Sequence, residues 1–189
     1  MSTATACHPF ASLTAFDEED AELLNVVIEA PKGSRNKFDF DPERGLFYIG
    51  GVLPAGAIFP YDFGFVPQTL GEDGDPLDIM VLTDDGSLAF AGCLIATRLL
   101  GGIKAEQGKP GEQSERNDRL IGVMHKSREY GTARSLADIP VEIVEDIEHF
   151  FRSYNQAKGI EFKPLDRCGP NEARALVKAG MDKHRAGKS

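Results

Sequence analysis

The stretch Gly71-Glu72-Asp73-Gly74-Asp75-Pro76-Leu77-Asp78 places three aspartates within six residues and leads into the apolar run Ile79–Leu82. Packing three carboxylates together costs stability unless cations lie between them, because like charges repel. Gly74 and Pro76 bend the chain, so alternate carboxylates can turn towards a common point. The apolar run that follows has the composition of a buried strand. The stretch therefore predicts a cation-binding loop anchored to a strand.

The donor atoms of this loop indicate which metal it would hold. Oxygen ligands with no Cys or His beside them select hard cations, so Mg²⁺ is the expected metal. A calcium loop of the helix-loop-helix type is excluded, because Asp78 and Asp84 stand where that loop needs Gly and Glu. An ordinary acidic turn between two strands stays open on these residues alone.

Short strands broken by turn residues surround the loop on both sides. Apolar and β-branched runs predict strands at 24–30, 37–40, 46–49, 63–66, 79–83, 94–100 and 119–123. Asp84-Asp85-Gly86-Ser87 is typical of a hairpin turn between two of them. The charged, glycine-containing segment 106–118 indicates an exposed loop or a long hairpin tip. Many short strands at this spacing favour a small closed or nearly closed antiparallel barrel over a parallel sheet.

The C-terminal third of the chain changes to a helical period. Asp138-Ile139-Pro140 has the composition of a helix start. A second helix is expected from Gly169-Pro170 towards Gly180, with Ala173, Leu176 and Val177 inward. In the first helix, one face carries the apolar residues Ile143, Val144, Ile147, Phe150, Phe151 and Tyr154 and the pattern ends near Gly159.

The fold class is therefore α+β, a small barrel with two C-terminal helices packed on it. We expect the folded domain over residues 23–180. A flexible polar lead-in at 1–22 precedes it, and a basic tail at 181–189 follows it.

Composition and charge exclude several classes of protein. The net charge of −9 argues against a general nucleic-acid binder, which would carry a basic face. No stretch approaches the roughly 20 apolar residues of a membrane span. Residues 1–16 lack the basic start and apolar run of a secretory signal. Cys7, Cys93 and Cys168 show no metal-ligand spacing, so reduced thiols and a cytoplasmic location are expected.

Taken together, these segments resemble the soluble inorganic pyrophosphatases of the single-barrel family. Asp73-Gly74-Asp75-Pro76-Leu77-Asp78 is similar to that family's signature D-x-D-P-x-D. The resemblance covers roughly residues 24–180 in the right order. Further matching segments are 27–31, 37–39, 59–65, 119–123 and 150–154. The resemblance implies a five-stranded, oligonucleotide-binding-like (OB-like) barrel that hydrolyses inorganic diphosphate to two phosphates with Mg²⁺, and a homo-oligomer.

The resemblance also implies roles for the acidic residues. Asp73 and Asp78 would hold the metals that activate a water molecule. Asp75 would be a ligand and would also orient or deprotonate that water, as a general base. Glu29 matches a carboxylate tied to an additional metal. Glu106 aligns with one of the later metal aspartates of the family.

On the substrate side, Lys37, Arg119 and Tyr154 match residues that contact phosphate oxygens. Arg119 stands where the family has a lysine, so the charge is kept although the geometry differs. Tyr154 is also in line with the apolar helix face, so a packing role stays open. Our hypothesis is that the segment 106–119 folds over the site, with Arg116 as a further substrate-binding cation.

Several family positions are changed in this chain, which makes it a divergent member. Gly51 and Asn155 stand at the positions of a phosphate-binding arginine and lysine. Phe59 and Phe63 stand at those of two active-site tyrosines. The loss of two cations weakens binding or slows turnover unless other groups replace them. Asn117 or Asp118 aligns with the second of the later metal aspartates.

The sequence is compatible with three functions. The first is hydrolysis of inorganic diphosphate. The second is a related hydrolase of an organic or nucleotide diphosphate, since Gly51 leaves room where a terminal phosphate is normally clamped. The third is a non-catalytic barrel that binds metal and phosphate.

Overall fold

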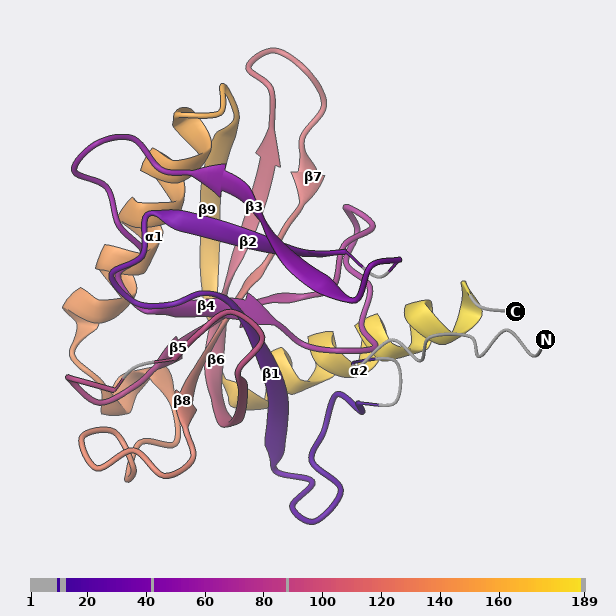
Figure 1. Ribbon diagram of the computed structural model, residues 1–189, viewed down its shortest axis with the longest axis vertical. Coiled ribbons are helices and arrows are strands. Elements are labelled where there is room, and N and C mark those ends of the chain that lie inside the picture. The colour runs from indigo at the N-terminus through magenta and orange to yellow at the C-terminus, as the bar shows by residue number, and fades with distance from the viewer. Residues whose placement is uncertain (1–9, 11–12, 42, 88, 188–189) are drawn as a thin grey trace.

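The computed structural model describes residues 10, 13–41, 43–87 and 89–187, and its centre is a ring of five strands (Figure 1). The members of the ring are β1 (Leu23–Ala30), β4 (Asp62–Phe65), β5 (Asp78–Leu82), β8 (Arg119–Met124) and β6 (Leu94–Gly108). Each strand pairs with the next in this order, and β6 pairs with β1 again. The predicted α+β barrel is confirmed.

One pairing corrects the expected antiparallel arrangement. β5 and β8 run parallel, whereas the other four pairings of the ring are antiparallel. The long strand β6 and its return lie between β5 and β8 in the sequence, so the chain re-enters beside β5 in the same direction. The ring is therefore mixed.

The predicted hairpin turn at residues 84–87 is also wrong, because the strands before and after it do not pair with each other. The neighbours of β5 are β4 and β8, so β5 does not pair with β6, which begins only at Leu94. The Asp84 carboxylate instead accepts hydrogen bonds from the backbone N–H groups of Arg128 at 2.9 Å and Glu129 at 3.1 Å. The acidic turn joins two loops rather than two paired strands.

Four further strands lie outside the ring. β2 (Asn36–Asp41) and β3 (Leu46–Val52) form a separate hairpin, and β7 (Glu115–Arg116) and β9 (Glu161–Cys168) both pair with β6. The predicted long hairpin tip is thus confirmed as the β6–β7 hairpin, which stands at the top of Figure 1. β9 has no counterpart among the predicted strands.

The two predicted helices are present. The 3₁₀ turn η1 (Leu136–Asp138) leads into α1 (Val141–Gln156), whose N-cap is Pro140, and α1 packs against β9. α2 (Pro170–Ala186) begins with Pro in its first turn, as expected, and packs against β6. It continues past Gly180, because Lys183, His184 and Arg185 in the last turn suit the negative end of the helix dipole.

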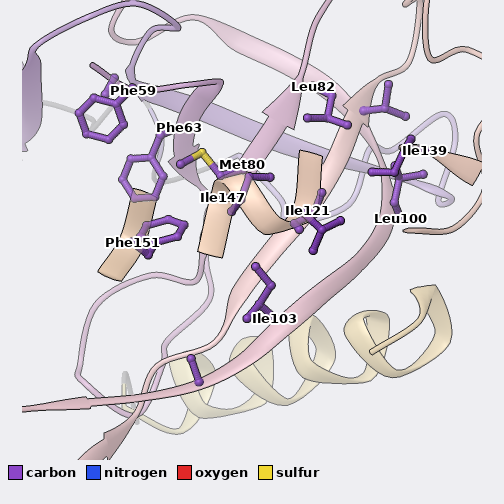
Figure 2. Packing of buried hydrophobic residues seen from close by; sticks show 14 of the residues in the cluster. Phe59, Phe63, Met80, Leu82, Leu100, Ile103, Ile121, Ile139, Ile147 and Phe151 are labelled. Atoms are coloured by element: carbon purple, nitrogen blue, oxygen red, sulfur yellow. The ribbon is translucent and has the colours of Figure 1, made fainter. Parts of the chain in front are cut away.

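The apolar face of α1 closes one end of the core. Val144, Ile147 and Phe151 are buried in α1, as the periodicity predicted. Figure 2 shows Ile147 beside Met80 of β5 and Phe151 beside Phe63 of β4. α2 buries Ala173 and Val177 in a second cluster on the other side of the sheet.

The described part of the N-terminal segment packs on the ring. Ala15 is fully buried, and its carbonyl accepts a hydrogen bond from the backbone N–H of Asn25 at 3.0 Å. Cys93 and Cys168 carry free thiols, while Cys7 lies outside the described residues. Within the described ranges, no helix has the length and apolar character needed to cross a membrane.

Candidate active site

The acidic loop between β4 and β5 is bent by its own hydrogen bonds. Gly74 has a φ of 86°, a conformation that favours glycine. The backbone N–H of Gly71 donates to the carbonyl of Asp75 at 2.7 Å. The buried Thr69 hydroxyl accepts from the backbone N–H of Leu77 at 3.0 Å. These contacts fix the loop in the turned form that its glycine and proline predicted.

A cavity of about 910 Å³ opens beside this loop. Most of the residues selected from the sequence line it: Asp73, Asp75, Asp78, Glu29, Lys37, Arg119 and Tyr154. They come from the loop, from four strands and from α1. The three aspartates therefore share one cavity instead of facing separate regions of solvent.

Lys37 connects the strands β1 and β2 at the wall of the cavity. Its Nζ lies 3.1 Å from Glu29 and 2.6 Å from Asp39. Burial raises the pKa of Glu29 to about 7, although Lys37 lowers it. Burial also opposes the charge on Lys37, but Glu29 and Asp39 hold the pKa of this lysine above its ordinary value. A proton can therefore reside on Glu29 near neutral pH.

Arg119 joins two of the aspartates through a short network. Its Nη1 lies 2.5 Å from Asp78, and it donates to the amide oxygen of Asn117. The Asn117 amide donates in turn to Asp73 at 2.7 Å. The Arg119 guanidinium lies 4.9 Å from the centre of the Phe151 ring, and its Nε is buried without a hydrogen-bond partner among the described residues.

The cavity carries more negative than positive side chains. Among its lining residues, three are cations, Lys37, Arg119 and Lys158, whereas five are carboxylates, Glu29, Asp39, Asp73, Asp75 and Asp78. Burial and the neighbouring Asp73 raise the pKa of Asp75, and burial raises that of Asp78 even though Arg119 opposes it. An excess of carboxylates around one cavity favours the entry of cations.

The donor set fits a hard divalent cation, but Asp73, Asp78 and Glu29 are engaged with other partners. Where the structure is described, no three His, Cys, Asp or Glu side chains are gathered closely enough to hold a metal ion. Asp78 is held by Arg119, and Asp73 by Asn117. A metal at this loop would therefore have to take carboxylate oxygens from these partners.

Tyr154 packs in an aromatic cluster and also lines the cavity. Its ring stacks on Phe150 with 5.6 Å between the ring centres. Its hydroxyl accepts a hydrogen bond from Lys158 Nζ at 2.6 Å. Phe59 is 1% exposed and lies in the same aromatic cluster, 5.6 Å from Phe63, which lines the cavity. Both interpretations of Tyr154 are thus compatible with its position.

Glu106 and Arg116 are not among the residues lining this cavity. Glu106 on β6 lies opposite Arg116 in the β6–β7 hairpin and accepts a hydrogen bond from Ser114 at 3.2 Å. Arg116 pairs with Asp118 at 2.5 Å and lines a second cavity of about 320 Å³ behind the acidic loop. Of the segment expected to fold over the site, Gln107, Asn117 and Arg119 reach the main cavity.

Gln107 and Lys158 are among the cavity residues that were not selected from the sequence. Gln107 points inward where Glu106 does not, because successive side chains of a strand face opposite sides. Lys158 lies in the turn after α1, and its Nζ reaches back to the hydroxyl of Tyr154. Asn155 is buried and donates to the carbonyl of Phe151 at 2.9 Å. A Cβ built on Gly51 meets no atom within 4 Å, so this position of the wall is open.

Known proteins with this sequence pattern and fold were found by comparison. The family model for inorganic pyrophosphatase matches residues 26–185. An inorganic pyrophosphatase from Synechocystis sp. is 36% identical over 157 residues, which are 83% of this chain and 87% of that protein. The soluble inorganic pyrophosphatase 2 of Chlamydomonas reinhardtii is 31% identical over 94% of this chain and 88% of its own length.

Solved structures show the same likeness. The crystal structure of inorganic pyrophosphatase from Thermus thermophilus superposes with a TM-score of 0.80 at 31% identity, over 92% of this chain and 97% of that one. An inorganic pyrophosphatase from Neisseria gonorrhoeae gives a TM-score of 0.80 at 29% identity, over 93% of this chain and 98% of that one. With the acidic loop, its shared cavity and the ring of strands in place, the chain belongs to the inorganic pyrophosphatase family.

Proposed function

We propose that this chain hydrolyses inorganic diphosphate to two phosphates, with Mg²⁺ as its metal. The observation that carries the proposal is the loop 71–78, whose three aspartates line one cavity with an excess of carboxylates. Membership of the inorganic pyrophosphatase family supports the substrate. A related hydrolase of organic diphosphates and a non-catalytic barrel are not favoured by these relatives.

The charge of the cavity explains why a metal is required. Diphosphate is an anion and is repelled by five carboxylates that only three cations oppose. Mg²⁺, when bound, supplies the positive charge that holds the phosphates and lowers the pKa of a water molecule at the site. Oxygen-only donors favour Mg²⁺ over softer metals. Metal ligation by Asp73, Asp75, Asp78 and Glu29 is part of the proposal.

Asp75 is proposed as the base that orients and deprotonates the attacking water. In the described ranges, no ion pair or side-chain hydrogen bond engages the Asp75 carboxylate, whereas Asp73 and Asp78 are each held by a partner. Burial and Asp73 raise the pKa of Asp75, which makes it a better proton acceptor than an ordinary aspartate. Its availability and its basicity both support the role.

Lys37, Arg119 and Tyr154 are proposed to bind the phosphates. Lys37 Nζ and the Arg119 guanidinium lie on the cavity wall beside the carboxylates. Guanidinium and ammonium groups are strong donors to phosphate oxygens. Glu106 and Arg116 stand outside the cavity, so the proposal gives them no contact with metal or substrate in this arrangement.

We further propose that the protein is cytoplasmic and forms a homo-oligomer. The name of the Chlamydomonas relative, a soluble enzyme, supports the first point. Exposed apolar side chains on β3, Leu46, Ile49 and Val52, support the second, because burying them against another copy would remove apolar area from water. Sedimentation velocity would contradict the oligomer if the protein sediments as a monomer at micromolar concentration.

The experiment that tests the function measures phosphate release from three substrates. Inorganic diphosphate, a nucleoside triphosphate and a sugar diphosphate are each offered with Mg²⁺ and with EDTA. We expect rapid release from inorganic diphosphate with Mg²⁺ and none with EDTA. Preferred release from the sugar diphosphate, or equal release with EDTA, would overturn the proposal.

A further inference from the structure

The pair Arg119–Asp78 joins a buried guanidinium to a partly buried carboxylate. The Arg119 side chain is 6% exposed and that of Asp78 is 24% exposed. Arg119 is also packed against the rings of Phe151 and Phe162, at 4.9 and 5.7 Å from their centres. An ion pair in such surroundings is hard to separate, because either charge left alone would be buried without compensation.

Asn117 connects Arg119 to a second aspartate, Asp73. Its amide oxygen accepts from Arg119, and its amide N–H donates to Asp73 at 2.7 Å. Asp73 and Asp78 are therefore tied to each other through two side chains that both come from the β7–β8 segment. The two aspartates are also two of the proposed metal ligands.

The same guanidinium is incompletely satisfied. The buried Nε of Arg119 has no hydrogen-bond partner within the described residues, and the contact of Nη2 with Gln107 is long, at 3.5 Å. A guanidinium has five N–H donors, so this arrangement leaves a buried donor unused. The network neutralises Asp78 but does not give Arg119 its full set of partners.

We propose that Arg119 is an internal counter-ion, which holds Asp78 in the metal-free protein and competes with a divalent cation for that carboxylate. Asn117 couples Asp73 to the same competition. The inference rests on the proposed function, because it takes Asp73 and Asp78 as metal ligands. It adds that the chain's own arginine sets how tightly the metal binds and stabilises the fold when the metal is absent.

The test compares Arg119→Gln and Arg119→Lys with the parent protein. Mg²⁺ affinity is measured by calorimetry without diphosphate, and thermal unfolding is followed with EDTA and with Mg²⁺. Removing a positive charge next to a ligand carboxylate is expected to tighten Mg²⁺ binding by ~10-fold in Arg119→Gln. In EDTA this variant should unfold at a lower temperature than the parent, and Mg²⁺ should raise its melting temperature by more. Arg119→Lys keeps the charge but not the planar set of donors, so it should lie closer to the parent than Arg119→Gln in both readouts.

A matched control and a ligand variant accompany the test. Arg167→Gln removes another arginine–carboxylate pair, Arg167–Glu148 at 2.8 Å, which lines neither cavity, and should leave Mg²⁺ affinity unchanged. Asp78→Asn should bind Mg²⁺ more weakly than the parent. If Asp78→Asn does so but Arg119→Gln binds Mg²⁺ no more tightly than the parent, the counter-ion inference alone is overturned.

The remaining outcomes are also decisive. If the parent does not bind Mg²⁺, the proposed function falls and this inference falls with it. If Arg119→Gln is unfolded in EDTA but folds with Mg²⁺, a cation at Asp78 replaces the guanidinium as proposed. If Mg²⁺ does not restore folding of that variant, the replacement does not occur and the inference is wrong.

Discussion

Phe59 and Phe63 belong to one aromatic cluster, but only Phe63 lines the cavity. Phe59 and Phe63 stand where the family resemblance has tyrosines, and their rings lie 5.6 Å apart (Figure 2). Phe59 is enclosed by the rings of Phe150 and Tyr154, whereas Phe63 borders the cavity. A hydroxyl added to Phe59 would be buried in an apolar environment, while one added to Phe63 lies closer to the polar wall.

We therefore expect Phe59→Tyr to be more destabilising than Phe63→Tyr. A buried hydroxyl without a partner costs about 1–3 kcal/mol, and Phe63→Tyr should cost less than ~1 kcal/mol. Chemical denaturation of the two variants and the parent measures the difference in free energy of unfolding. Equal losses at both positions would show that Phe63 is as enclosed as Phe59.

Much of the site was predictable from the sequence, and the remainder depends on contacts between distant segments. The loop aspartates and Lys37 were recognisable by residue type and spacing, and they do share a cavity. The network through Asn117 was not, because it joins residues 44 positions apart. Gln107 faces the cavity and Glu106 faces away, because neighbouring side chains of a strand point to opposite sides. An alignment that crosses a long hairpin can be off by one residue and so does not tell which of the two faces inward.

Glycine can be needed for lack of space as well as for its backbone conformation. In the ring, glycines that have no positive φ let neighbouring strands lie close together. Gly64 on β4 lies beside the irregular pairing of β1 between Ile28 and Ala30. A Cβ built on Gly64 would lie 2.1 Å from the backbone oxygen of Val27. Because a backbone atom cannot move aside as a side chain can, this position needs glycine.

Gly64→Ala is expected to lower the free energy of unfolding by at least about 1–3 kcal/mol, through displacement of β1 from β4. Gly51→Ala is the matched control, since a Cβ there meets no atom within 4 Å. It should change the free energy of unfolding by less than about 0.5 kcal/mol. Denaturant titration measures the free energy of unfolding of both variants. Similar losses in the two variants would contradict the close approach of the two strands.

The Asp84 contact between loops makes stability depend on pH. Hydrogen bonds from the backbone N–H groups of Arg128 and Glu129, and from the Ser127 hydroxyl, hold the pKa of Asp84 below its ordinary value of 3.8. A carboxyl with a lowered pKa stabilises the folded state above its unfolded pKa. That contribution is lost as the pH falls through the folded pKa.

We expect Asp84→Asn to melt at a lower temperature than the parent at neutral pH. The difference should shrink as the pH falls below about 4, because the parent carboxyl then becomes protonated as well. Thermal unfolding of both proteins across the acid range measures this. A difference that stays constant down to about pH 2 would show that the charge of Asp84 is not involved.

At the scale of elements, the sequence patterns found every strand of the ring but not their full pairing. β9 escaped prediction because Pro164 interrupts it and its exposed charges hide the alternation. The structure tolerates Pro164 because β9 pairs only with β6 and has an irregular register there. The parallel pairing of β5 and β8 likewise depends on which strands meet in space, which local periodicity does not encode.

For the molecule as a whole, the ring and the β2–β3 hairpin gather groups that are far apart in the chain. β1 supplies Glu29, β2 supplies Lys37 and β8 supplies Arg119. The loop before β5 supplies Asp73 and Asp75, and β5 itself begins with Asp78. The folded body reaches back at least to the buried Ala15, while the division at residues 22 and 180 stays a proposal. One cavity with excess negative charge results, and a metal reconciles it with an anionic substrate.

The most direct test of this account is the rate of phosphate release from inorganic diphosphate by Asp75→Asn at saturating Mg²⁺. Loss of the proposed base should reduce turnover by about 10²–10⁴-fold with the melting temperature retained. Asp85→Asn, which alters an exposed carboxylate paired with Lys32 at 2.6 Å, should turn over like the parent. Turnover of Asp75→Asn equal to that of the parent would contradict the account.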